Sequence, residues 1–168
     1  NVRKMNKKIH SINDKRLKKF KLDLEKVFLF LAQQIVRDGE GATKLIEVYV
    51  KNARSKLSAE KISRSIANSP LIKTAIYGSD PNWGRIIMAI GKTYEKVNKY
   101  KLKISFGNHL VAKNGLANPK IDERKLKKYL SKDKININID LNNGKEKSRV
   151  LTCDFSHRYI DINASYKT

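Results

Sequence analysis

The first quarter of the chain carries apolar residues at the period of an α-helix. Four of them recur at intervals of four, three and four positions: Leu24, Phe28, Leu31 and Ile35. This spacing places them on one face of a helix, which we predict over residues 14–38. Gly39 follows and can end the helix, because a positive φ costs glycine little. The polar and basic residues 1–13 are predicted to form an irregular lead-in.

A strand and a second helix are predicted next. Residues 44–50 alternate and are rich in β-branched side chains, which indicates a β-strand. Ser58 can cap the N-terminus of a helix over residues 58–68, because its hydroxyl can accept a hydrogen bond from a free backbone N–H. The Ser69-Pro70 pair that follows is expected to stop this helix.

The segment around the only tryptophan has a restricted backbone. Asp80 and Pro81 have the pattern of an N-cap and first helical residue, and they open a third predicted helix over residues 82–90. Its apolar residues share one face: Trp83, Ile86, Ile87 and Ile90. We interpret the run Asp80-Pro-Asn-Trp-Gly-Arg85 as a structural device, a capped helix start with a buried tryptophan.

The second half of the chain is more typical of strands. Residues 101–106 and 110–112 flank Gly107-Asn108, which is a hairpin signal. Residues 121–130 are predicted to form a short, basic helix. Residues 135–141 alternate strictly between apolar and polar side chains, which predicts a half-buried strand.

The last predicted elements are also strands. The turn Asn142-Asn143-Gly144 is expected to lead from the strand over residues 135–141 into one over residues 148–155, and residues 159–163 follow as a further strand-like segment. Together these patterns predict a mixed α/β (layered α+β) fold, with a mainly antiparallel sheet packed by helices. We predict a single domain over residues 14–168.

The charge of the chain allows two interpretations. There are 37 Lys and Arg residues against 16 Asp and Glu residues, so the formal net charge is +21. Such a charge can indicate a nucleic-acid-binding module. However, lysine greatly outnumbers arginine, and only residues 15–21 and 124–128 approach a dense basic cluster. A solvated lysine surface is therefore the preferred interpretation, and nucleic-acid binding is the alternative.

Few residues are suited to hold a metal or to form a disulfide. Cys153 is the only cysteine, and we expect it to be a buried structural thiol. The three histidines lie far apart in the sequence, so no metal site is predicted. Asp154 and Asp161 flank His157-Arg158, where an acid–base pair could be drawn, but solvation at a strand end is preferred. No apolar run approaches the ~20 residues of a membrane span, and no signal peptide is visible.

Two residues between the first helix and the first strand are candidates for chemistry. Glu40 lies between two glycines, which would let a ligand approach the backbone, and its carboxylate suits a substrate ammonium group. The alternative is a turn with an exposed glutamate. Thr43 follows Gly-Ala and could become an N-terminal nucleophile in a self-processing enzyme. Its preferred interpretation is the first residue of a strand.

The C-terminal segment keeps aromatic and apolar residues up to its end. Because chain termini are usually bland and frayed, this composition predicts a docked tail. Asn163 and Thr168 would then be polar groups placed in a pocket.

Three segments of the chain resemble one known family, the ornithine acetyltransferases, also called bifunctional glutamate N-acetyltransferases. Residues 34–48 include Asp-Gly-Glu-Gly-Ala-Thr-Lys, which is similar to the family's DGEGATK block. Residues 69–91 resemble its SPLVKTAIxGxDPNWGR block, and residues 153–168 resemble its CDLSxDYVxINADYRT ending. The order and spacing also agree over residues 27–168. Ser165 stands where the family pattern has aspartate.

The resemblance implies an enzyme of arginine biosynthesis in the cytoplasm. Such enzymes move an acetyl group from N2-acetylornithine to glutamate through a threonine acyl-enzyme, and some accept acetyl-CoA as the donor; no other cofactor is implied. Their precursor cuts itself within an Ala-Thr-Met-Leu motif, which this sequence lacks. We therefore expect this chain to be the C-terminal (beta-chain) part, with the nucleophilic threonine upstream of Asn1.

The resemblance also implies site residues and partners. Glu40, Asn163 and Thr168 match the positions of family substrate contacts, so we expect them to bind substrate, whereas no catalytic residue is expected in this chain. The partner would be the alpha chain of the same precursor, in a heterotetramer of two alpha and two beta chains. Without that partner, the chain is expected to expose apolar surface.

Overall fold

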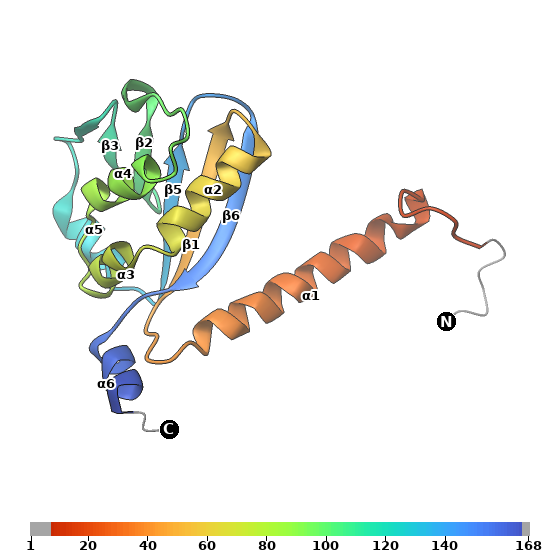
Figure 1. Cartoon of the computed structure of the whole chain (residues 1–168), viewed down its shortest axis with the longest axis horizontal. Coiled ribbons are helices and arrows are strands. Elements are labelled where there is room, and N and C mark those ends of the chain that lie inside the picture. Colours follow the sequence, from red (N-terminus) through yellow and green to blue (C-terminus); the bar gives the residue numbers. More distant parts are fainter. Residues whose placement is uncertain (1–7, 166–168) are drawn as a thin grey trace.

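The computed structural model describes residues 8–165, and a six-stranded sheet is its central element (Figure 1). The strand order is β4-β3-β2-β5-β1-β6. The strands, in chain order, are β1 (Leu45–Ala53), β2 (Lys103–Phe106), β3 (His109–Lys113), β4 (Leu116–Ala117), β5 (Lys134–Asp140) and β6 (Glu146–Cys153). β1 pairs parallel with β5, and the other pairs in this sheet are antiparallel. The predicted mixed, mainly antiparallel sheet is confirmed.

The helices lie on one face of the sheet or at its ends. The α-helices are α1 (Lys18–Arg37), α2 (Lys56–Ala67), α3 (Pro70–Tyr77), α4 (Trp83–Gly91), α5 (Glu123–Leu130) and α6 (His157–Ser165), with short 3-10 turns at Lys15–Leu17 and Lys99–Lys101. Figure 1 shows α2, α3 and α4 over the same face of the sheet, and α6 beyond one end of β6. The mixed α/β class therefore takes the form of one sheet with α2, α3 and α4 packed on one face.

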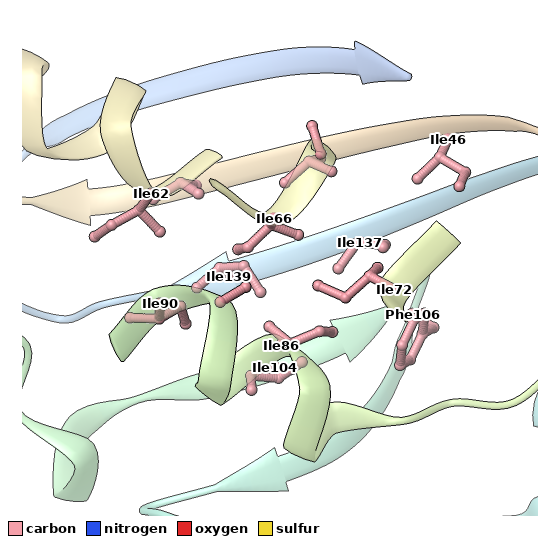
Figure 2. Close-up of a cluster of buried hydrophobic side chains, with 14 of the residues drawn as sticks. Ile46, Ile62, Ile66, Ile72, Ile86, Ile90, Ile104, Phe106, Ile137 and Ile139 are labelled. Carbon is pink, nitrogen blue, oxygen red and sulfur yellow. The ribbon is translucent and has the colours of Figure 1, made fainter. Parts of the chain in front are cut away.

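Alternation along β1 and β5 produces this one-sided arrangement. Ile46, Val48 and Val50 of β1 lie beside Ile135, Ile137 and Ile139 of β5, and all six are fully buried. The helices add isoleucines to the same core, including Ile62, Ile66, Ile72, Ile86 and Ile90 (Figure 2). The intervening residues of both strands are polar and point to the other face, as period-two geometry requires.

Helix α1 extends away from this body (Figure 1), and none of its residues is buried. The helix is confirmed within the range predicted for it. However, its apolar stripe faces solvent: Phe28 is 61% exposed and Ile35 is 74% exposed. Only its C-terminal part approaches the sheet. There, residues of α1 line a recess of about 420 Å³ together with Arg149 and Leu151 of β6. The expected exposure of apolar surface is thus located on α1.

Two predicted helix N-caps were wrong, and one helix was not predicted. Ser55, not Ser58, is the N-cap of α2, and its side chain accepts a hydrogen bond from the backbone N–H of Ser58. Asn82, not Asp80, is the N-cap of α4 and accepts from Arg85. The Ser69-Pro70 pair does end α2, but Pro70 also begins α3, which was not predicted. Proline is well suited to a first helical turn because the N–H that it lacks would have no helical partner there.

In the C-terminal third, the strand predicted over residues 159–163 was wrong. The predicted turn at residues 142–144 does lead from β5 into β6, but β1 lies between these two strands in the sheet. The turn at residues 142–144 passes over the end of β1, and Gly144 comes so close to Ala53 that a Cβ would lie 2.2 Å from its carbonyl oxygen. Residues 159–163 belong to α6 rather than to a strand. By contrast, the hairpin at Gly107-Asn108, the basic helix α5 and strand β5 are confirmed.

No helix among residues 8–165 is long and apolar enough to span a membrane.

Asp140 at the end of β5 allows a test of the fold by pH. Burial alone would raise its pKa, but hydrogen bonds from Asn52 (2.8 Å) and the Asn142 N–H (3.1 Å), together with Lys51, lower it below 3.8. A lowered pKa stabilises the folded state above pH 3.8, and this contribution is lost as the pH falls through the folded-state pKa.

We therefore expect Asp140→Asn to lower the free energy of unfolding at pH 7 by about 1 kcal/mol. The difference from wild type should shrink below pH 3.8. Denaturation of both proteins between pH 2.5 and 7 measures it, and a difference that is independent of pH would contradict this account.

Candidate functional site

Two residues predicted to bind substrate meet in the structure. Glu40 lies in the loop between α1 and β1, and Asn163 lies on α6. The Asn163 Nδ2 donates a 2.8 Å hydrogen bond to Glu40 Oε2, across 123 residues of sequence. Both side chains are exposed, so a ligand could reach them. Thr168, the third predicted residue, lies outside the described residues.

The loop that carries Glu40 packs directly against the start of α6. Gly41 has φ +66°, and a Cβ there would lie 2.5 Å from the backbone nitrogen of Tyr159. A side chain at this position is thus excluded twice, by its backbone conformation and by the close approach. Ser156 also donates a hydrogen bond to the Gly41 carbonyl oxygen. The glycine beside Glu40 is therefore explained by packing against α6.

A buried carboxylate holds the other end of the same loop. Asp154 follows β6, is only 1% exposed, and accepts hydrogen bonds from the backbone N–H groups of Thr43 (2.8 Å) and Lys44 (2.9 Å). The Thr43 hydroxyl donates to its second oxygen. The expectation of a solvated Asp154 was therefore wrong, because the strand end is covered by the 39–44 loop. Sequence reasoning missed this role, since the partners are about 110 residues apart.

Thr43 has a different setting from the one predicted. β1 begins at Leu45, so Thr43 precedes the strand rather than opening it. Its backbone N–H and its hydroxyl both donate to Asp154. The geometry therefore supports a structural role for Thr43.

Lys44 connects the loop to the ends of two helices. Its Nζ donates to the carbonyl oxygens of Ile76 (2.8 Å) and Leu130 (2.9 Å), near the C-termini of α3 and α5, and to the hydroxyl of Ser79 (2.9 Å). A cation is favourable at a helix C-terminus, where carbonyl groups lack partners. Burial lowers the pKa of Lys44, and the negative charge of Asp154 opposes this shift.

Aromatic contacts fix the N-terminal end of α6. The rings of Phe155 and Tyr159 stack with centroids 4.6 Å apart, and Lys73 Nζ of α3 lies 4.3 Å from the centre of the Phe155 ring. Tyr77 and His157 make an edge contact at 5.7 Å. These contacts hold only the start of α6. No residue of this helix is buried and Asn163 is exposed, so the prediction that Asn163 lies in a pocket was wrong. Cys153, expected to be buried, is half-buried, near Gly39.

Four recesses of the described chain are lined by neither Glu40 nor Asn163. One of about 580 Å³ is lined by Trp83 and residues of α5, and neither Glu40 nor Asn163 contributes to it. Trp83 is only partly buried against the core, whereas a buried tryptophan was predicted. Within residues 8–165, no group of three or more His, Cys, Asp or Glu side chains is placed to hold a metal ion.

The fold and the site define a mixed α/β domain with an exposed acid–amide pair beside the start of its central strand. The ArgJ family model matches residues 3–168 of this sequence. The chain therefore belongs to the ArgJ family, and the resemblance found in the three motifs is confirmed.

Individual relatives agree with this assignment. The chain is 48% identical over 161 residues to the arginine biosynthesis bifunctional protein ArgJ of Nitrobacter winogradskyi, and 46% identical over 161 residues to that of Bradyrhizobium diazoefficiens. Each match covers 96% of this chain and 39% of the relative, so the chain spans about two fifths of their length. The crystal structure of ArgJ from Bacillus halodurans superposes with a TM-score of 0.89 at 37% identity, covering 95% of this chain and 75% of that one.

The contact between Gly41 and α6 can be tested with a pair of glycine variants. Gly41→Ala should cost of the order of 1–3 kcal/mol of stability, because it combines a positive φ with a clash against backbone. Gly91→Ala, at the end of α4, should be neutral or stabilise by up to about 1 kcal/mol, because no atom lies within 4 Å of the added Cβ. Chemical denaturation of both variants measures the difference. Equal stabilities would show that α6 does not pack on Gly41 in solution.

Proposed function

We propose that this chain is part of an acetyltransferase that moves an acetyl group from N2-acetylornithine to glutamate in arginine biosynthesis. Membership of the ArgJ family supports the pathway, and the names of the relatives point to it. The observation that carries the role of this chain is the contact between Glu40 and Asn163. The alternative of nucleic-acid binding rested on net charge alone, so the family assignment favours the enzyme.

The Glu40–Asn163 pair has the chemistry that an α-amino acid requires. Glu40 offers a carboxylate to the substrate ammonium group, and the Asn163 amide offers N–H donors to the substrate carboxylate. In the chain without a ligand, these two groups satisfy each other. An α-amino acid could replace their mutual hydrogen bond with two charge-assisted ones. Thr168 would add a hydroxyl donor, as its match to the family motif suggests.

The proposed reaction uses covalent catalysis. A threonine hydroxyl attacks the acetyl carbonyl of N2-acetylornithine, ornithine leaves with its amine, and a threonine ester remains. The amine of glutamate then attacks this ester, forms N-acetylglutamate and restores the hydroxyl. The nucleophile and the Thr-Gly oxyanion hole would lie in the part of the enzyme upstream of this chain. Acetyl-CoA could supply the acetyl group in place of N2-acetylornithine, and no other cofactor is proposed.

The exposed face of α1 supports a partner for this chain. A helix with an apolar stripe normally buries it against another element, whereas the stripe of α1 is exposed. We propose that the alpha chain of the same precursor covers it, in a cytoplasmic heterotetramer of two alpha and two beta chains. The length of the relatives, about two and a half times the matched segment, leaves room for such a chain.

The substrate role of Glu40 can be tested in the complete enzyme. We expect wild type to transfer acetyl from N2-acetylornithine to glutamate, and Glu40→Gln to lower kcat/KM. Loss of one charge-assisted contact costs roughly 1.5–3 kcal/mol, or about ten- to a hundredfold. Glu60→Gln is the matched control, because Glu60 is a partly exposed residue of α2 that pairs only loosely with Lys56 at 3.9 Å. Unchanged kinetics in Glu40→Gln would remove Glu40 from the site.

Self-processing can be tested by the intact mass of the complete enzyme under denaturing conditions. We expect two chains, the second beginning at a threonine upstream of Asn1. A cut before Thr43 would instead make that residue the nucleophile. One uncut chain would contradict the proposed processing.

A further inference from the structure

We propose that Asp154 is a positioning residue, which holds the loop of residues 39–44 so that the Glu40 carboxylate faces Asn163. This inference rests on the proposed substrate role of the Glu40–Asn163 pair. The carboxylate of Asp154 binds Thr43 and Lys44 rather than either of these side chains. It would act through the backbone of the loop that carries Glu40 and of the segment that leads into α6.

The position of Asp154 in the chain suits this role. It is the first residue after β6 and lies three residues before α6, the helix that carries Asn163. Its carboxylate binds Thr43 and Lys44, which come just after Glu40. Its own N–H donates to the Lys44 carbonyl oxygen at 3.3 Å. One residue is thus bonded to the loop of Glu40 and continuous with the helix of Asn163.

The donors around Asp154 require a carboxylate. Oδ1 accepts two backbone N–H groups, and Oδ2 accepts the Thr43 hydroxyl. An ionised carboxylate is an acceptor on both oxygens, whereas an asparagine amide would turn an NH₂ group toward one set of donors. A buried carboxylate is also costly unless such donors satisfy it. The charge therefore favours the one loop position in which all three donors reach it.

Contacts beside the Asp154 hydrogen bonds also restrict how Glu40 lies relative to Asn163. Ser156 donates to the Gly41 carbonyl oxygen, and Gly41 contacts the backbone of Tyr159. The loop is therefore anchored at two places after Glu40, first at Gly41 and then at Thr43 and Lys44. Release of the Asp154 anchor should leave Glu40 attached but misplaced. Misplacement of about 1 Å can cost on the order of a hundredfold in rate.

The test measures kcat/KM in the complete enzyme for Asp154→Asn, Glu40→Gln and the double variant. We expect Asp154→Asn alone to lower kcat/KM roughly ten- to a hundredfold. In the Glu40→Gln background, the same change should cost much less, because both act on one interaction. Equal losses in the two backgrounds would overturn the proposal, since Asp154 would then act independently of Glu40.

Asp140→Asn is the matched control. Asp140 also accepts several hydrogen bonds but lies at the opposite end of β1 from the site. Its substitution should lower stability and leave kcat/KM within about twofold of wild type. If Asp140→Asn lowered kcat/KM as much as Asp154→Asn does, the effect would be general destabilisation and the proposal would fail.

A second pair of variants covers the case in which Asp154→Asn does not fold. Thr43→Val removes only the hydroxyl donor to Asp154, and Thr43→Ser keeps it. We expect Thr43→Val to lower kcat/KM and Thr43→Ser to restore most of it. Wild-type kinetics in Thr43→Val would contradict the proposal.

Hydrogen exchange separates this proposal from the proposed function. If wild type showed no acetyl transfer, the proposed function would fail, but the backbone amides of residues 39–45 would still report on the loop. Asp154→Asn, or Thr43→Val where Asp154→Asn does not fold, should speed their exchange at least tenfold relative to Asp140→Asn. Unchanged exchange would overturn the positioning role whatever the activity.

Discussion

The parallel pairing of β1 with β5 is the constraint on which the rest of the structure depends. It places two apolar rows side by side, and α2, α3 and α4 cover them from one face. Because β1 lies inside the sheet, its first residue is fixed between β5 and β6. The loop that precedes it then has one place to go, beside the end of β6, where Asp154 receives it.

Buried polar bonds, rather than apolar packing, organise the candidate site. Asp154 and Lys44 carry opposite charges at the start of β1, and each is satisfied by several hydrogen bonds from or to other elements. These bonds have directions, so they define the path of the loop more sharply than apolar contacts can. Glu40 and Asn163 stay exposed at the edge of this network. The hydrogen bond from Ser156 to the Gly41 carbonyl oxygen likewise holds Gly41 close to the start of α6.

Whether each sequence prediction was right depends on how far apart in the sequence the interacting residues lie. Strand β5, the hairpin and the long helix α1 were predicted because their period is local and strong. The helix starts were misplaced where several Ser, Asp or Asn residues compete, because local rules do not say which one adopts the cap conformation. The assignment of residues 159–163 as a strand failed because alternation over five residues is too short to exclude a helix, and this segment continues the helix that begins at His157. The prediction that residues 14–168 form a single domain stays a prediction, because α1 extends away from the sheet and has no buried residue.

The sequence by itself determined the mixed α/β class and the family, and it predicted Glu40 and Asn163 as substrate contacts. These conclusions depend on local periodicity and on short motifs, which a single chain displays directly. Only the tertiary structure decided that Glu40 and Asn163 touch, that Asp154 is buried beneath their loop, and that the stripe of α1 faces solvent. Each of these depends on which distant segments become neighbours. Sheet order decides that, and no local pattern in the chain encodes the sheet order.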